Sequence, residues 1–147
     1  MDNNQFKATE AKLYKYNETI TEIKCIRISI RRIEEDFKGC GSIDYSNECC
    51  GGNGFNSKVE TEVIEREREI SKLRKLLNKK EEEKDKIDSV IESLSDAERQ
   101  LVELKYTNRN TRSWEEVGFL LKFSPIYCKT KLRRRVINKF KNVLFIE

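Results

Sequence analysis

The sequence contains no histidine and only one proline, and each shortage narrows what the chain can be. Histidine is the commonest general base and a frequent metal ligand, so its absence disfavours acid–base catalysis and metal chemistry. No nucleophile–base pair or set of metal ligands takes its place, and we expect neither an enzyme nor a cofactor. The single proline, Pro125, leaves long stretches of the chain without a helix breaker.

Long apolar runs are missing as well. No stretch approaches the roughly 18–20 apolar residues that a membrane-spanning helix needs. The N-terminal segment MDNNQFKATEAK has no apolar region of the kind found in secretory signals. We therefore expect a cytoplasmic protein that contacts no membrane.

Apolar residues make up 37% of the chain and charged residues 38%, a balance that is usual for coiled coils. Apolar residues in steps of three and four predict one long helix from about Gln5 to Phe37 and a second from Ser57 to Leu94. Their similar lengths on either side of one connector favour an antiparallel hairpin within the chain. Pairing of these helices between subunits is the alternative, and we expect a homodimer formed through the coiled coil.

Glycine is scarce outside one segment. Five of the six glycines lie between residues 39 and 56, together with Cys40, Cys49 and Cys50. Glycine permits turns, so this segment is predicted to be a loop. The cysteines lack the paired spacing and the fourth ligand that tetrahedral zinc requires, and a reducing cytosol opposes a stable disulfide. We expect free thiols and no structural metal; zinc and a regulatory disulfide are the alternatives.

Three shorter amphipathic segments follow, with the sequences LSDAERQLVELKY, TRSWEEVGFLLKF and SPIYCKTKLRRRVINKF. A Ser-x-x-Glu capping box opens each of the first two, and Ser124 followed by Pro125 opens the third. The buried face of the third is predicted from residues spaced by four: Cys128, Leu132, Val136 and Phe140. Only Lys122, Phe123 and Ser124 lie between the helical patterns of the second and third segments. Two helices joined by so short a turn predict a helix-turn-helix.

Positive charge is concentrated in the same region. Eight Lys and Arg residues and no acid lie between Lys122 and Lys141. Residues 94–147 contain twelve Lys and Arg and six Asp and Glu, a net charge of +6, whereas the whole chain has +4. A basic patch on one helix is typical of phosphate binding, so we expect double-stranded DNA as the partner.

The segments LSDAERQLVELKY and SWEEVGFLLKFS resemble region 4 of bacterial sigma factors, the helix-turn-helix that binds the upstream promoter element. The arrangement of a coiled-coil half followed by this module resembles the phage late-gene transcriptional regulators of the RinA/ArpU type. These resemblances imply an activator of phage or prophage genes in the cytoplasm of a bacterial host. They also imply RNA polymerase as a second candidate partner.

The resemblance to the sigma module also implies candidate DNA-binding residues. Base contacts are assigned to Pro125, Ile126, Lys129 and Thr130, with Arg133 one turn further on. Phosphate contacts are assigned to the start of the preceding helix, at Arg112 and Ser113. From the residues alone, Tyr127 either faces DNA or packs inside, and the basic run adds Lys131 and Arg134.

Taken together, these patterns predict an all-α protein with a long two-helix coiled-coil hairpin at residues 1–93 and a helix-turn-helix domain at residues 94–147. The predicted function is sequence-specific DNA binding in transcription regulation. Two alternatives are a sigma-like factor that binds core RNA polymerase and a small terminase-type DNA-packaging protein. Binding to a defined upstream promoter element would favour the first two functions, and a ring-shaped oligomer would favour the third.

Overall fold

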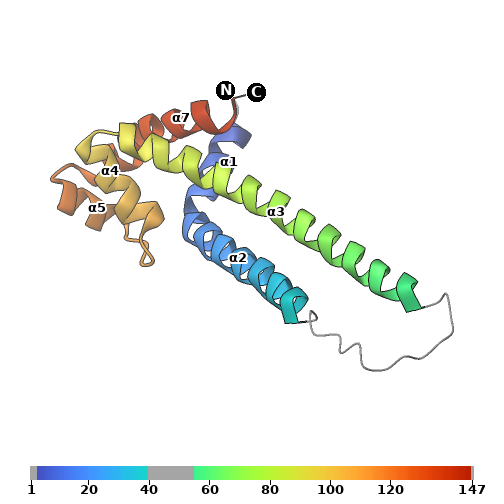
Figure 1. Ribbon diagram of the computed structural model, residues 1–147. Helices are drawn as coiled ribbons and strands as arrows, with labels where there is room; N and C mark the ends of the chain where they lie inside the picture. Colours follow the sequence, from blue (N-terminus) through green and yellow to red (C-terminus); the bar gives the residue numbers. More distant parts are fainter. Residues whose placement is uncertain (1–2, 40–54, 147) are drawn as a thin grey trace. The chain divides into compact units, whose positions relative to one another are not determined.

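Helices form all the regular structure in the computed structural model, which describes residues 3–39 and 55–146 (Figure 1). The predicted all-α class is therefore confirmed. Within these residues no helix has both the length and the apolar content needed to cross a membrane. The elements in chain order are α1 (Asn3–Tyr14), α2 (Tyr16–Gly39), α3 (Phe55–Ser93), α4 (Asp96–Val102), η1 (Glu103–Thr107), α5 (Trp114–Leu121), α6 (Pro125–Tyr127), η2 (Cys128–Leu132) and α7 (Arg133–Leu144). Cys40, Cys49 and Cys50 of the predicted loop lie outside the described residues.

The chain divides into two compact units. The first unit joins Met1–Thr21 to Glu81–Glu147, and the second unit is Glu22–Lys80. Both α2 and α3 therefore pass from one unit into the other. The sequence-based boundary after residue 93 stays a prediction, but the unit that contains residues 94–147 also includes α1 and the last turns of α3.

The first predicted helix is interrupted. Lys15 forms a turn between α1 and α2. The residues just beyond it bond to distant parts of the first unit: the Tyr16 hydroxyl donates to Asp88, and the Asn17 amide donates to the Thr107 carbonyl at 2.6 Å. The single uninterrupted helix predicted here is wrong at Lys15, because local periodicity does not register contacts with partners 72 and 90 positions away.

The second predicted helix is confirmed, since α3 covers residues 55–93 where 57–94 was expected. In the second unit, two ion pairs join α2 to α3: Glu34 with Arg74 at 2.8 Å and Glu22 with Lys80 at 2.5 Å. Among the apolar residues spaced by three and four in this unit, Ile23 and Ile30 are buried, whereas Val63, Ile70, Leu73 and Leu77 are only partly buried. The coiled-coil hairpin itself stays a prediction.

The predicted helix starts in the first unit are confirmed. The Ser95 N–H donates to the Glu98 carboxylate at 3.2 Å before α4. Before α5, Ser113 and Glu116 form the reciprocal pair of bonds, at 3.0 and 3.2 Å. The Ser124 hydroxyl accepts the N–H three residues further on, at 3.2 Å, and starts α6. These bonds satisfy donors that the first turn of a helix leaves free.

A three-residue turn at 122–124 joins α5 to the next helix. Lys122 adopts a left-handed conformation with φ 58°, and its N–H donates to Phe119 at 3.3 Å. The N–H of Phe123 donates to the Gly118 carbonyl at 3.0 Å. A Cβ atom on Gly118 would lie 2.9 Å from the Phe123 carbonyl oxygen, a clash with backbone. Glycine at this position therefore lets the turn fold tightly against α5.

The elements α6, η2 and α7 follow one another without a break from Pro125 to Leu144, and we call them together the basic helix. Its second part, Cys128–Leu132, is a π-type turn. Residues four apart drift by about 40° per step around a regular α-helix, and the wider π turn reduces that drift. The predicted face is accordingly buried throughout, at Cys128, Leu132, Val136 and Phe140.

The core of the first unit draws on nearly every element of that unit. The largest fully buried side chains are Tyr106 and Phe140. Around them lie buried residues of α1, α3, α4 and α5, namely Leu13, Ile87, Val90, Leu101, Val102, Val117 and Leu121. Trp114 packs against this cluster while remaining partly exposed. The basic helix is thus fixed by a core that includes the N-terminal helix α1.

Candidate nucleic-acid interface

The cations between residues 122 and 141 differ in how they are used. Arg133 pairs with Glu10, and Lys139 pairs with the buried Glu98 at 2.7 Å. Six cations form no ion pair with any described residue: Lys122, Lys129, Lys131, Arg134, Arg135 and Lys141. Five of these six lie on the basic helix and Lys122 lies in the turn before it, so this region keeps positive charge that a polyanion could neutralise.

Arg133 is held by α1. Its Nε donates to Glu10 Oε1 at 2.8 Å, and its Nη2 donates to Glu10 Oε2 at 2.6 Å. The Tyr106 hydroxyl donates to the same carboxylate at 2.7 Å. The Glu10 side chain is 14% exposed and that of Arg133 is 28% exposed, so the two-bond pair lies largely out of water. Arg133 therefore fastens the basic helix to α1 and η1.

The same cluster shifts the pKa values of its members. Burial alone would raise the pKa of the Glu10 carboxyl, but the bonds from Arg133 and Tyr106 and the positive charge of Arg133 outweigh burial and lower it. For Tyr106, burial, followed by its bond to Glu10, raises the hydroxyl pKa far above its usual value. The carboxylate therefore stays charged, and the phenol stays neutral, across the physiological pH range.

Two aromatic rings flank the Arg133 guanidinium. Its central carbon lies 5.4 Å from the Phe6 ring centre and 5.9 Å from the Trp114 ring centre. The Lys105 ammonium lies 4.9 Å from the same Trp114 ring. Cation–π attraction adds to the ion pair. These contacts engage Trp114 within the protein, as expected for a residue that packs rather than stacks on a base.

A cleft of about 440 Å³, which we call the turn cleft, lies between the starts of α5 and the basic helix. Its lining residues are Lys105, Ser113, Trp114, Glu115, Pro125, Ile126 and Lys129. Four of the predicted DNA-binding residues thus lie together here. Ile126 is 76% exposed at the rim, which leaves a large apolar side chain in solvent. Glu115 places one negative charge in the cleft and opposes phosphate at that point.

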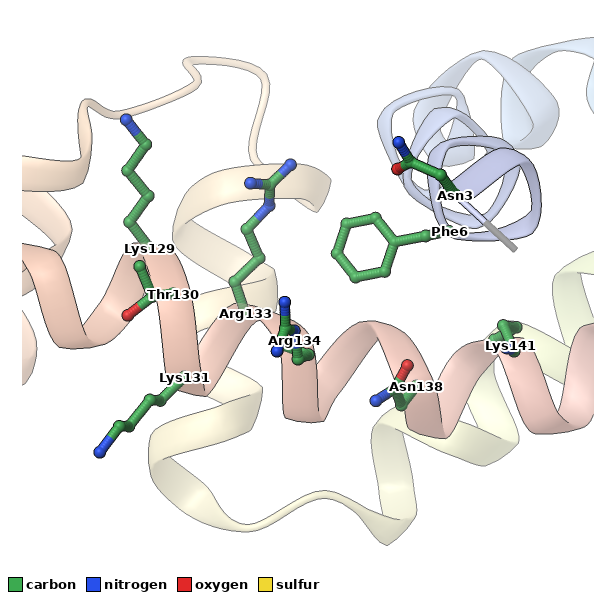
Figure 2. Close-up of a pocket in the computed structure, with 9 residues that line it drawn as sticks. All are labelled: Asn3, Phe6, Lys129, Thr130, Lys131, Arg133, Arg134, Asn138 and Lys141. Atoms are coloured by element: carbon green, nitrogen blue, oxygen red, sulfur yellow. The ribbon is translucent and has the colours of Figure 1, made fainter. Parts of the chain in front are cut away.

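A second hollow, of about 650 Å³, lies between α1 and the basic helix, and we call it the α7 groove. Figure 2 shows its nine lining residues: Asn3, Phe6, Lys129, Thr130, Lys131, Arg133, Arg134, Asn138 and Lys141. Five of the predicted DNA-binding residues are among them. Lys129 lines both hollows, so the two adjoin. None of the described residues that line the α7 groove is acidic.

Two predicted residues lie outside both hollows. Tyr127 is partly buried, and its ring centre lies 5.5 Å from that of Phe123, which favours a packing role. Arg112 is exposed in the segment before α5, and its carbonyl accepts a bond from Lys105 at 2.9 Å. Neither side chain contributes to the surface that the other candidates share.

Four residues of the α7 groove were absent from the sequence-based candidates. Asn138 and Lys141 follow Arg134 by four and seven positions, so helical periodicity could have identified them. Asn3 and Phe6 are about 130 positions away from Arg134 in the chain. No local pattern could have placed them beside the basic helix.

The described residues contain no group of three potential metal ligands, and the chemistry of both hollows is ionic and hydrogen-bonding. Lysine and arginine donors with carboxamide and hydroxyl neighbours suit phosphate and base edges. Comparisons with protein-family models, with curated proteins and with solved structures found no match for the chain.

Proposed function

We propose that this protein is a sequence-specific DNA-binding transcription regulator of phage or prophage genes, with α5 and the basic helix acting as a helix-turn-helix. The observation that supports this most directly is the set of six cations, five on the basic helix and Lys122 in the turn before it, that form no ion pair with a described residue. The three-residue turn before that helix has the length that the motif uses. An activator role follows from the resemblance to phage late-gene regulators.

In this proposal the first turns of the basic helix enter the major groove. Lys129 is exposed and would donate to guanine O6 and N7. Ile126 is exposed beside it and would contact a thymine methyl group, which accounts for an apolar side chain left in water. The Thr130 hydroxyl donates to the Ile126 carbonyl at 2.6 Å and keeps lone pairs for an incoming donor.

The roles of Arg133 and Ser113 differ from those that the resemblance implies. Arg133 is committed to Glu10, so its contribution is to position the helix rather than to contact a base. Ser113 and the N–H of Glu116 bond to each other, and Glu115 and Glu116 lie in the same first turn. Those two acids weaken phosphate binding at this end of α5.

The test begins with sequencing of the DNA fragments that the protein enriches from its host or phage genome. Binding of Lys129→Ala, Arg134→Ala and the control Lys24→Ala is then measured on the enriched sequence and on a scrambled duplex. Lys129→Ala should weaken specific binding by about 1–3 kcal/mol and relax the preference at one or two base pairs. Arg134→Ala should weaken both duplexes equally and reduce the salt slope by about one unit.

If both variants weaken both duplexes equally, the basic helix is only an electrostatic clamp and the proposal of base recognition fails. Specificity would then have to come from a partner such as RNA polymerase. If Lys24→Ala, whose side chain is exposed on α2, has the same effect, the loss would be one of general charge. Mass measurement of the free protein tests the proposed homodimer.

A further inference from the structure

The α7 groove extends well beyond the residues assigned to base contact. Arg134, Asn138 and Lys141 lie four and then three positions apart, so they share one face of α7. Figure 2 shows these three side chains along one stretch of the basic helix, with Lys129 near the far end of the groove. From Lys129 to Lys141 the helix rises by about 18 Å. The groove is therefore an elongated surface rather than a compact pocket.

The charge of the groove specifies the class of ligand. Its described lining residues include five cations and no acid, and Arg133 is the only one of the five that pairs with a carboxylate of a described residue. The other polar residues are neutral: Asn3, Thr130 and Asn138. Such a surface suits an extended anion that needs several separate cationic contacts, more than it suits one compact anion.

The opposite wall of the groove is held in place. Phe6 and Asn3 belong to α1. The two bonds that Arg133 donates to Glu10, together with the Phe6–Arg133 contact, fix α1 against the basic helix. Leu13, on the same helix, is fully buried in the core. The groove is thus preformed, and a ligand would meet both walls without ordering them first.

We propose that the α7 groove binds the sugar–phosphate backbone of the DNA that flanks the bases contacted by Lys129. This inference rests on the proposed function, because it takes duplex DNA as the ligand. One DNA strand rises about 3.4 Å per nucleotide, so 18 Å corresponds to about five nucleotides of one strand. Lys141 contacts a phosphate at the distal end, and the footprint extends about five base pairs to one side of the recognised bases.

The test compares a short duplex, which ends about two base pairs beyond the recognised bases and so reaches Arg134 but not Lys141, with one longer by eight base pairs on each side. Wild-type protein, Lys141→Gln, Arg134→Gln and the control Lys24→Gln are titrated with each duplex at several salt concentrations. On the long duplex Lys141→Gln should raise Kd about three- to tenfold near 0.15 M salt and lower the salt slope by about 0.9. On the short duplex it should match the wild type. Arg134→Gln should lower the salt slope on both duplexes.

Two results would overturn the inference: an equal loss for Lys141→Gln on both duplexes, or no change on either. Displacement of the long duplex by inorganic phosphate or a nucleoside diphosphate in the wild type, with no such displacement from Lys141→Gln, would instead assign the groove to a small phosphate ligand and overturn it too. Because the dependence on duplex length requires no sequence preference, it is also measured with scrambled DNA. Loss of cognate preference contradicts the proposed function, whereas loss of length dependence contradicts only the inference about the groove.

Discussion

The two compact units of this chain are both built from helices, but they bury apolar side chains to different extents. In the first unit the buried apolar residues come from α1, α3, α4, η1, α5 and the basic helix, and several of them have no exposed surface. In the second unit, among side chains that the structure describes, only Ile23 and Ile30 are buried, while Ile28, Ile64 and Leu76 are exposed. Helices that surround a core on several sides bury whole side chains, whereas a pair of helices buries little more than one seam.

This difference in burial bears on what each unit can do. The first unit can hold an interface rigid by itself, because its core fixes the basic helix and α1 together. The second unit leaves apolar surface that association with another helix would cover, as the sequence-based expectation of a homodimer requires. The following experiments test that contrast, each with a variant in one unit and a control in the other.

Truncation of one apolar side chain in each unit should give the largest difference in the free energy of unfolding. Phe140→Ala removes a fully buried ring from the first unit and should lower its free energy of unfolding by about 3–5 kcal/mol. Leu77→Ala, at a partly buried position of the second unit, should cost about 1 kcal/mol. Urea unfolding followed by the fluorescence of Trp114, the only tryptophan, reports on the first unit, and circular dichroism reports on both. Equal costs would contradict the contrast.

Loss of an ion pair should also cost more stability in the first unit than in the second. Glu10→Ala leaves the Arg133 guanidinium and the Tyr106 hydroxyl without their acceptor and should destabilise the first unit by about 1.5–3 kcal/mol. Glu34→Ala removes the exposed pair with Arg74 and should change stability by less than about 1 kcal/mol.

Because Arg133 also positions the basic helix, Glu10→Ala should weaken DNA binding as well, while Glu34→Ala should leave it unchanged. A double-mutant cycle with Arg133→Met isolates the coupling between the two side chains. Coupling near zero would show that α1 and the basic helix are held together by other contacts.

Acid should weaken the first unit through two carboxyl groups. The folded-state pKa of Glu10 is lowered because bonds from Arg133 and Tyr106 outweigh burial, and that of Glu98 is lowered because bonds from Lys139 and Ser95 do the same. A lowered folded pKa contributes stability that is fully present above the unfolded value of about 4.5 and is lost as the pH falls through the folded value.

The Trp114-detected free energy of unfolding should therefore fall as the pH is lowered from about 6 towards 3. Glu10→Gln and Glu98→Gln should each flatten this dependence, and Glu34→Gln serves as the control. An unchanged slope in both variants would mean that other carboxyl groups cause the acid sensitivity.

Replacement of Lys122 in the turn by glycine should give the smallest change in stability. Lys122 has φ 58°, a conformation that costs a non-glycine residue roughly 1 kcal/mol, so Lys122→Gly should stabilise the first unit by several tenths of a kcal/mol. The same change inside a helix of the second unit, Lys24→Gly, should destabilise by about 0.8–1.0 kcal/mol. Opposite signs in thermal unfolding would support the geometry of the turn, and destabilisation by both would contradict it.

The sequence was sufficient where the determining contacts are local. The serine caps before α4, α5 and α6 follow from side chains that bond to the backbone three residues away. The buried face of the basic helix follows from a spacing of four. The interruption at Lys15 and the pairing of Arg133 with Glu10 were not predicted, because both depend on partners far away in the chain, with Glu10 and Arg133 separated by 123 positions.

The candidate site shows the same limit. The position of Lys129 on an exposed basic face could be inferred from charge and helical period alone. The second wall of the α7 groove could not, since Phe6 and Asn3 reach it only through the folding of α1 against α7. The charge pattern of a sequence can therefore predict an anion-binding surface. The shape of that surface depends on tertiary packing.

The π turn at Cys128–Leu132 has a consequence for insertions and deletions. Such a turn is an α-helix with one additional residue, so deletion of Thr130 would restore a regular helix and leave Val136 and Phe140 in phase with the core. Deletion of Arg135 would instead rotate all later residues by about 100° and expose the buried face. The π turn is thus the part of the basic helix where chain length can change by a residue while the hydrophobic register beyond it is preserved.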